Sequence, residues 1–395
     1  MVKLWGPFVV LFVVSMVVAI AATPMARRLA WRLGSVDMPG GRRINCRPLP
    51  RMGGIAVFIA LACGLLVEFV GSVMGVWPTS ISLVNSRNVG LDYPKLVLGF
   101  CMIFLTGLLD DRFSLSPKQK LFGQIVAASV AVSGGLIIDV VVNPFANTAI
   151  ELGWVAYPIT VVYLVAYTNI FNLIDGLDGL ASGIACIAGL SMWIISTMAG
   201  HLDAAALAIM LAGATLGFLR YNFNPASIIL GDSGSLLIGF VLGSISLMSV
   251  QRVAGLTSII VPLVIAGIPI IDTFSAIVRR GRAHVSIGQA DKGHIHHRLM
   301  NEGFNQRQTV ILIYVWTAIL CGGSIVMTQV PVLPRILIFC FLIVASFLFA
   351  LHLRLFEPVL LHHYNPDTKT DELISPQDPA FEAEAERFEE QHPLL

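Results

Sequence analysis

Residues 153–199 read GWVAYPITVVYLVAYTNIFNLIDGLDGLASGIACIAGLSMWIISTMA. Two apolar runs, 153–174 and 179–199, are each as long as a membrane-crossing helix of about 20 residues, and a short polar junction separates them. In lipid every backbone polar group must be paired within its own segment, so runs of this length form helices rather than open strands. The stretch therefore predicts two membrane helices that meet at one face of the bilayer.

Apolar runs of the same kind fill most of the chain. Eleven are found, at 4–22, 52–76, 95–109, 119–137, 153–174, 179–199, 204–220, 234–250, 256–278, 310–328 and 335–353. They lack the alternating ten-residue pattern of a membrane barrel. Because the third run is short for a span, we expect ten or eleven spans in an all-α, polytopic membrane domain over 1–353. A cytoplasmic acidic tail over 354–395 is expected to follow.

The composition excludes other classes of protein. Of the 395 residues, 56% are hydrophobic and 12% are charged, against about 25% charged in soluble domains. A mean hydropathy of +0.81 excludes a disordered chain. A net charge of +1 excludes nucleic-acid binding by bulk electrostatics. The six cysteines show no CxxC spacing, so neither a zinc site nor a disulfide framework is indicated.

Lysines and arginines between the runs set the orientation. One set of loops carries 17 of them: Arg27, Arg28, Arg32, Arg42, Arg43, Arg47, Arg51, Arg112, Lys118, Lys120, Arg220, Arg279, Arg280, Arg282, Lys292, Arg298 and Arg307. The alternate loops carry five: Lys3, Arg87, Lys95, Arg252 and Arg335. Positive residues stay in the cytoplasm, so the first set is predicted to be cytoplasmic and the N-terminus to lie outside.

Carboxylates, amides and histidines gather at four places, all on the predicted cytoplasmic face. They are Asp110 and Asp111; Asn169, Asn172, Asp175 and Asp178; the GDSGS segment at 231–235; and His294, His296 and His297. The orientation was derived from basic residues alone. The agreement therefore indicates a polar site at this face.

The first two groups suggest different chemistry. The adjacent carboxylates of Asp110 and Asp111 repel each other, and either a divalent metal or Arg112 would relieve this. Asn169, Asn172 and Asp175 recur every three residues and share one helical face. A capped helix end would explain only part of this second group.

The last two groups suit anions. The GDSGS segment opens an apolar run, where free backbone N–H groups at a helix N-terminus favour phosphate, although Asp232 could be a plain cap. The histidines follow several basic residues and form a cationic loop that could hold a diphosphate. No cysteine or second histidine cluster completes a zinc site there.

Taken in order, DDR at 110–112, NIFNLIDGLDGLA, GDSGS and DKGHIHHRL resemble the polyprenyl-phosphate N-acetylhexosamine-1-phosphate transferase family. The resemblance runs from about residue 47 to about residue 304. It implies magnesium-dependent transfer of a sugar 1-phosphate from a UDP-sugar to a polyprenyl phosphate, with release of UMP. It also implies a location in the bacterial inner membrane. A transporter of an anionic solute is the alternative of another class, but its binding residues would lie near the bilayer midplane.

The branch of the family follows from the histidines. The spaced His294-Ile295-His296-His297 resembles the GlcNAc-1-phosphate branch, whereas phospho-MurNAc-pentapeptide transferases usually have three consecutive histidines. The segment 45–54 is similar to the family's Pro-x-Pro-x-x-Gly-Gly stretch, with Asn45 where a His is common. Asp272 and Thr273 also match the family pattern. A buried Asp272 needs a partner, for which we expect Arg279 or Arg280.

These observations give each residue a hypothetical role. We expect Asp232 and Asn172 to hold Mg²⁺, and Asp110 or Asp111 to act as proton acceptor or further metal ligand. The residues expected to bind substrate are Asn169, Asp175, Asp178, Arg280, His294, His296 and His297. The expected partners are a UDP-sugar, a polyprenyl phosphate and the bilayer. The sequence does not choose between a monomer and a homodimer.

Overall fold

The protein is described by a computed structural model that covers residues 2–38, 48–77, 91–142, 149–250, 257–282, 293–357, 361–365 and 370–374. Within these residues the chain is almost entirely helical, which confirms the predicted fold class. The helices are α1 (Val2–Leu33), α2 (Gly54–Val73), α3 (Tyr93–Phe113), α4 (Pro117–Ser133), α5 (Ala156–Ile174), α6 (Leu180–Met198), α7 (Leu202–Asn222), α8 (Gly231–Val250), α9 (Thr257–Ile265), α10 (Gly267–Arg282), α11 (Ile295–Asn301), α12 (Gln306–Gln329) and α13 (Val332–His352), with a 3-10 turn at Gly153–Val155.

The described residues also contain short antiparallel strand pairs. They are β1 (Val36–Asp37) with β2 (Leu49–Pro50), β3 (Val140–Val142) with β4 (Ala149–Glu151), and β5 (Leu361–Asn365) with β6 (Thr370–Ile374). Several residues used above lie outside the described residues: Arg42, Arg43, Asn45, Arg47, Arg87, Arg252 and Lys292. Of the expected tail, only 354–357 and the β5–β6 hairpin are described.

Each of the eleven apolar runs corresponds to helical structure, but the ninth is divided. Its two parts, α9 and α10, meet at Ala266, between Pro262 and Pro269. Proline has no N–H to donate along a helix, which explains the break. The short helix α11 was not predicted.

Eight helices among the described residues are long and apolar enough to cross a membrane: α1, α2, α5, α6, α7, α8, α12 and α13. The protein is therefore a multi-pass membrane protein. The count of ten or eleven spans and the outside position of the N-terminus stay predictions.

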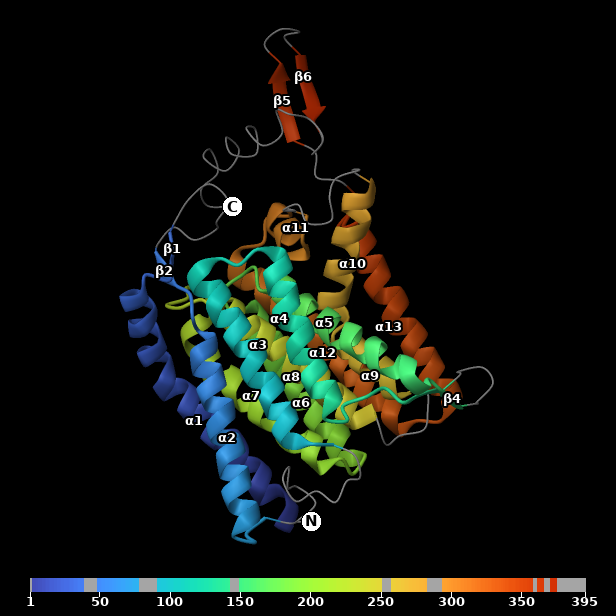
Figure 1. Cartoon of the computed structure of the whole chain (residues 1–395). Helices are drawn as coiled ribbons and strands as arrows, with labels where there is room; N and C mark the ends of the chain where they lie inside the picture. The colour runs from blue at the N-terminus through green and yellow to red at the C-terminus, as the bar shows by residue number, and fades with distance from the viewer. Residues whose placement is uncertain are drawn as a thin grey trace.

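Helix α8 lies at the centre of the bundle and contacts α2, α3, α5, α6, α7 and α9 (Figure 1). Glycines permit its closest contacts. A Cβ on Gly54 of α2 would collide with the backbone at Gly234, and one on Gly107 of α3 would collide with the backbone of Asp232. The first turn of α8 is therefore held between two helix backbones with no room for further side-chain atoms.

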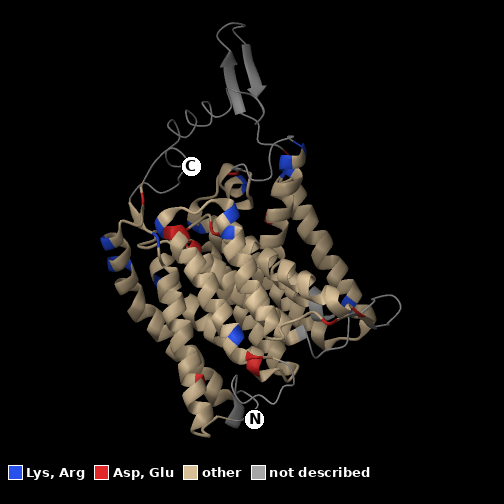
Figure 2. Ribbon diagram, viewed as in Figure 1, with Lys and Arg blue, Asp and Glu red and all other residues tan. Residues whose placement is uncertain are grey.

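A long-range backbone contact joins the start of α2 to the start of α8. Ile229 donates its N–H to the Pro50 carbonyl at 2.9 Å, and Gly53 donates to the Ile229 carbonyl at 3.0 Å. This pairing places Arg51 beside the start of α8. Most charged residues lie at this end of the bundle (Figure 2), and the chain begins at the opposite end (Figure 1).

Candidate active site

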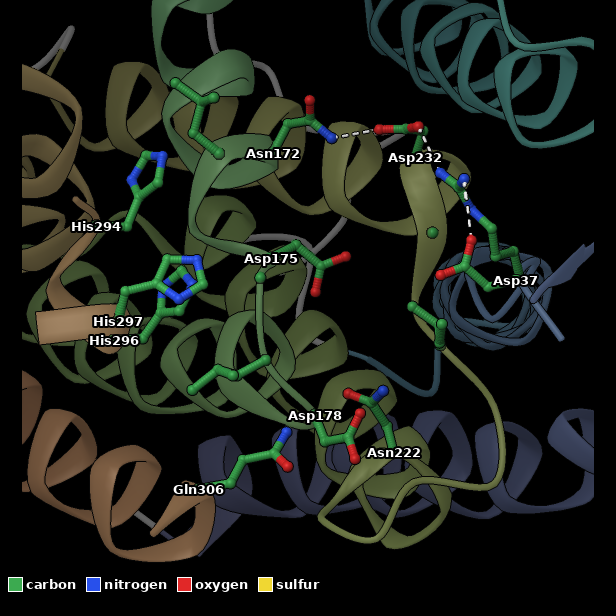
Figure 3. A pocket seen from close by; sticks show the side chains of 16 residues that line it. Asp37, Asn172, Asp175, Asp178, Asn222, Asp232, His294, His296, His297 and Gln306 are labelled. Carbon is green, nitrogen blue, oxygen red and sulfur yellow. Dashed lines mark hydrogen bonds and ion pairs between the residues drawn. The ribbon is translucent and has the colours of Figure 1, made fainter. Parts of the chain in front are cut away.

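A cavity of about 420 Å³ opens at the charged end of the bundle (Figure 3). Seven of the residues predicted from the motifs line it: Asn172, Asp175, Asp178, Asp232, His294, His296 and His297. They come from α5, the loop after it, α8 and the region of α11. Groups that are more than a hundred residues apart in the sequence therefore face one space, and the roles proposed for them stay predictions.

The other four predicted residues, all in the described part of the chain, do not line this cavity. Asn169 exchanges amide hydrogen bonds with Gln124 of α4, at 2.7 and 3.1 Å. Arg280 lies in the last turn of α10. Asp110 contacts Lys120, and Asp111 accepts hydrogen bonds from the start of α8. Residues that share a sequence motif thus do not all face the same cavity.

Lys120 of α4 connects three of the predicted residues. Its Nζ lies 2.7 Å from Asp232 Oδ1, 2.9 Å from Asp110 Oδ2 and 3.0 Å from Asn172 Oδ1. Two carboxylate oxygens and one amide oxygen thus converge on a single ammonium group. The sequence analysis counted Lys120 only as a topological charge.

Asp232 faces a second cation. Arg51 Nη2 lies 3.2 Å from Asp232 Oδ2, and Arg51 Nη1 lies 3.7 Å from Asp37 Oδ1. Asn172 also donates from Nδ2 to Asp232 Oδ1 and, at 2.8 Å, to Ser235 Oγ. The Asp232 carboxylate is thus fixed by two positive groups and one amide at the edge of the cavity. Figure 3 shows its contacts with the amide of Asn172 and with the arginine.

Asp111 has a different environment from the one predicted. Its side chain has no exposed surface and accepts hydrogen bonds from the N–H of Asp232 at 2.8 Å and of Ser233 at 3.0 Å. These are the N–H groups of the second and third residues of α8, in the helix start that we expected to face a phosphate. That expectation is wrong for these two groups, because a carboxylate from α3 already occupies them.

The carboxylates of the loop after α5 have raised pKa values. Burial, then the negative charges of Asp232 and Asp111, raise the pKa of Asp175 well above its ordinary value, although this side chain keeps some contact with the cavity. Burial also raises the pKa of Asp178, against hydrogen bonds donated to its Oδ2 by Ala226 N at 3.0 Å and Asn224 Nδ2 at 3.1 Å. Protonated Asp175 can donate a hydrogen bond as well as accept one.

Asp272 has different partners from the predicted arginines. Its fully buried carboxylate pairs through Oδ2 with His294 Nδ1 at 2.8 Å, and its Oδ1 accepts from the Ile295 N–H at 2.7 Å. The expectation of an ion pair with Arg279 or Arg280 is therefore corrected. Asp272 holds the start of α11 and orients the His294 ring.

The three histidines form a stack along the cavity wall. The rings of His294 and His296 are nearly parallel with centroids 5.8 Å apart, and those of His296 and His297 are 4.3 Å apart. Burial, then the neighbouring rings of His297 and His294, lower the pKa of His296 well below 6.5. A Cβ on Gly176 would collide with the His296 ring, so this glycine lets the loop after α5 pack on α11.

The residues missed by the sequence analysis are Arg51, Lys120, Asp37, Asn222 and Gln306. Arg51 lies in the quoted segment 45–54 but was one of seven arginines assigned to the first cytoplasmic loop. Asn222 and Gln306 line the cavity from the ends of α7 and α12. The periodicity of these helices carries no signal for them, because polar residues are common at helix ends and nothing local singles out these two.

The oxygen donors at the cavity edge suit a magnesium ion that also binds water and substrate. Among the described residues, no group of three or more His, Cys, Asp or Glu side chains could hold a metal ion by itself. However, Mg²⁺ commonly takes one or two carboxylates and completes its shell with water and substrate phosphates. The convergent oxygens of Asp232, Asn172 and Asp110 have the chemistry that such a site needs.

Comparison with known proteins identifies relatives of this chain. Residues 93–250 match the model of glycosyl transferase family 4. A Bacillus subtilis protein called probable undecaprenyl-phosphate N-acetylglucosaminyl 1-phosphate transferase is 37% identical over 336 residues, which cover 85% of this chain and 89% of the relative. A decaprenyl-phosphate N-acetylglucosaminephosphotransferase of Mycolicibacterium smegmatis is 35% identical, with 77% and 78% covered.

A third relative is named for the transfer of a different sugar phosphate. The phospho-N-acetylmuramoyl-pentapeptide-transferase of Clostridium beijerinckii is 32% identical over 331 residues, which cover 81% of this chain and 94% of the relative. The chain is thus a membrane-embedded transferase of the kind that the motifs indicated. It belongs to glycosyl transferase family 4, among the polyprenyl-phosphate N-acetylhexosamine-1-phosphate transferases.

Proposed function

We propose that this protein transfers GlcNAc-1-phosphate from UDP-GlcNAc to undecaprenyl phosphate, or to a related polyprenyl phosphate, and releases UMP. The reaction takes place at the cytoplasmic face of the bacterial inner membrane and starts a surface polysaccharide. The observation that carries the proposal is the position of Asp232, at the cavity edge between Lys120 and Arg51. Relatives named for this reaction support it.

The reaction joins two phosphate groups, so negative charge must be neutralised before the bond forms. An oxygen of the polyprenyl phosphate attacks the β-phosphorus of the donor, and the bond from that phosphorus to the bridging oxygen breaks. UMP leaves with the electron pair. Arg51 lines the cavity, and Lys120 contacts Asp232 at its edge, so both would supply positive charge to the phosphates.

Magnesium dependence is part of the proposal. Bound Mg²⁺ would supply Lewis-acid polarisation of the donor diphosphate, and Asp232, Asn172 and Asp110 are the side chains that offer it oxygens. Asp110 is also our candidate to accept a remaining proton from the lipid phosphate. Asp111, which caps α8, instead positions Asp232.

The rest of the cavity would bind the donor. Asp175 and Asp178 offer carboxyl groups to the base N–H and ribose hydroxyls of the uridine. His294 and His297 are the groups that we assign to the sugar and diphosphate. Neutral, buried His296 supports both rings.

A transfer assay tests the proposal. Protein purified in detergent is given labelled UDP-GlcNAc, undecaprenyl phosphate and Mg²⁺, and both UMP and the lipid-linked product are measured. We expect one UMP for each lipid-linked sugar phosphate. Absence of transfer with all polyprenyl phosphates tried would reject the function.

The second candidate is transfer of phospho-MurNAc-pentapeptide, favoured by the Clostridium beijerinckii relative. The spacing of the histidines argues against it. The same assay with UDP-MurNAc-pentapeptide decides between them. UMP release with this donor and none with UDP-GlcNAc would establish the second candidate instead.

A further inference from the structure

The chain makes a tight turn where it leaves the last membrane helix. Residues 353–357 form this turn, which we call the exit turn. Arg354 donates its N–H to the Leu351 carbonyl at 2.9 Å, and Leu355 donates to the Ala350 carbonyl at 3.0 Å. Arg354 has φ = 52°, in the left-handed region, and this pattern of bonds is that of a Schellman helix end. Leu353 and Leu355 are buried, so the turn is fixed to the bundle.

Three arginines from two other helices bind the carbonyl groups of the exit turn. From α10, Arg279 Nη1 donates to the Leu355 carbonyl and Arg282 Nη1 to the Phe356 carbonyl at 3.1 Å. From α11, Arg298 Nη2 donates to the Glu357 carbonyl at 2.7 Å. Carbonyl groups beyond a helix C-terminus carry partial negative charge and lack helical donors, so guanidinium groups satisfy them well.

The same two helices are joined at the histidine end of α11. Asp272 of α10 binds both His294 and the Ile295 N–H. A Cβ on Gly293 would overlap the Arg279 guanidinium, so this arginine packs between the exit turn and the residue before His294. Helix α11 is therefore fixed at its start by Asp272 and near its end by Arg298.

We infer that the exit turn positions the histidine side of the cavity. Through its bond to Glu357, Arg298 sets the orientation of α11, the seven-residue helix that carries His296 and His297. Arg298 is a positioning residue, since it is absent from the residues that line the cavity in the described chain. The inference rests on the proposed function, in which these histidines contact the donor.

The three arginines bind main-chain carbonyl groups of the exit turn. Side chains of the turn can therefore be changed without removing these acceptors. The side chains of Arg354 and Glu357 are exposed, and the mechanism does not use them. Glycine suits the left-handed φ of residue 354, so Arg354→Gly keeps the turn. Glu357→Gln keeps the carbonyl. Both are controls that should leave the rate and KM within about twofold of the unchanged protein.

The test variants are Arg298→Ala and Arg298→Lys. Lysine keeps the charge but not the planar fork of donors, so it should not restore the contact. We expect each variant to raise the KM for UDP-GlcNAc by about tenfold, as is typical when a charge-assisted hydrogen bond is lost, with a smaller effect on kcat. In a His297→Ala background, Arg298→Ala should raise KM much less, because the two residues act through one contact.

Hydrogen exchange provides a readout that does not depend on the substrate. Amides of 295–301 should exchange faster in Arg298→Ala than in Glu357→Gln. Unchanged exchange, a wild-type KM in Arg298→Lys, or full additivity with His297→Ala would each overturn the inference. If the unchanged protein transfers no sugar phosphate, the proposed function fails, and the exchange data still decide whether the exit turn holds α11.

Discussion

The carboxylate of Asp111 on α3 caps the first turn of α8, where its Oδ2 accepts from Ser233 Oγ at 2.6 Å and from Ser233 N at 3.0 Å. The cap comes from another helix, so it fixes α8 against α3 as well as satisfying free N–H groups. Asp232 lies one residue before Ser233 and faces the cavity. The position of the central site carboxylate is thus set by a contact outside the cavity.

This contact should be measurable as stability. Ser233→Ala removes one buried hydrogen bond and should lower the free energy of unfolding by about 1 kcal/mol. Asp111→Ala leaves several buried donors unsatisfied and should cost about 2–3 kcal/mol. Denaturant unfolding in detergent micelles measures both. Ser129→Ala, which alters an exposed serine on α4, is the control and should change little; an equal loss in all three variants would contradict the capping role.

Asp232 should be essential for transfer. Asp232→Asn and Asp110→Asn should each lower the rate by at least about a hundredfold, because a metal-held carboxylate contributes several kcal/mol to transition-state stabilisation. Folding should survive in both variants. Asp139→Asn, which changes an exposed carboxylate, should retain full activity. Transfer that persists after exhaustive chelation of divalent ions would refute the magnesium assignment.

Lys120 and Mg²⁺ should compete for the same oxygens. In Lys120→Met the rate should fall at least tenfold, through loss of one charge-assisted contact. The magnesium concentration for half-maximal activity should also fall, because Asp232 and Asn172 lose their internal cation. Lys118→Met removes an exposed lysine from the same helix and is the matched control. A higher magnesium requirement in Lys120→Met would show that the ammonium assists metal binding.

The buried histidine predicts a pH dependence of stability. The pKa of His296 lies well below 6.5 in the folded protein, so the unfolded chain binds its proton first as the pH falls. Stability is therefore lost from about pH 6.5 downwards. His296→Phe keeps a ring against Gly176 but removes the proton. Between pH 7 and pH 5, the melting temperature of His296→Phe should fall less than that of the unchanged protein. Equal falls in the two proteins would show that His296 does not cause the loss of stability.

The sequence predicted the fold class because membrane helices need only local information. A run such as 179–199 is apolar at nearly every position, and in lipid such a segment must form a helix to pair its backbone groups. The break at Ala266 was hidden inside a continuous apolar run. Its cause, two prolines that each remove one donor, becomes visible only once the helix is traced.

The site was predictable where one motif carries several polar residues, as around Asn172 and Asp175. It was not predictable where a partner returns from a distant segment. Arg51 reaches Asp232 only because 50–54 pairs with 229–230, and no local pattern encodes that contact. Asp272 was predicted to pair with arginines about two turns along its helix, whereas the chain folds back and brings His294 closer.

The residues that form the wall of the cavity come from well over half of the length of the chain, from Asp37 before α2 to Gln306 at the start of α12. During synthesis, the ribosome delivers these segments to the membrane one after another. A partly translated chain lacks part of the cavity wall until the start of α12 has been made. Under the proposed function, a chain that has not yet reached α12 therefore cannot use the carrier lipid while its first helices are being inserted.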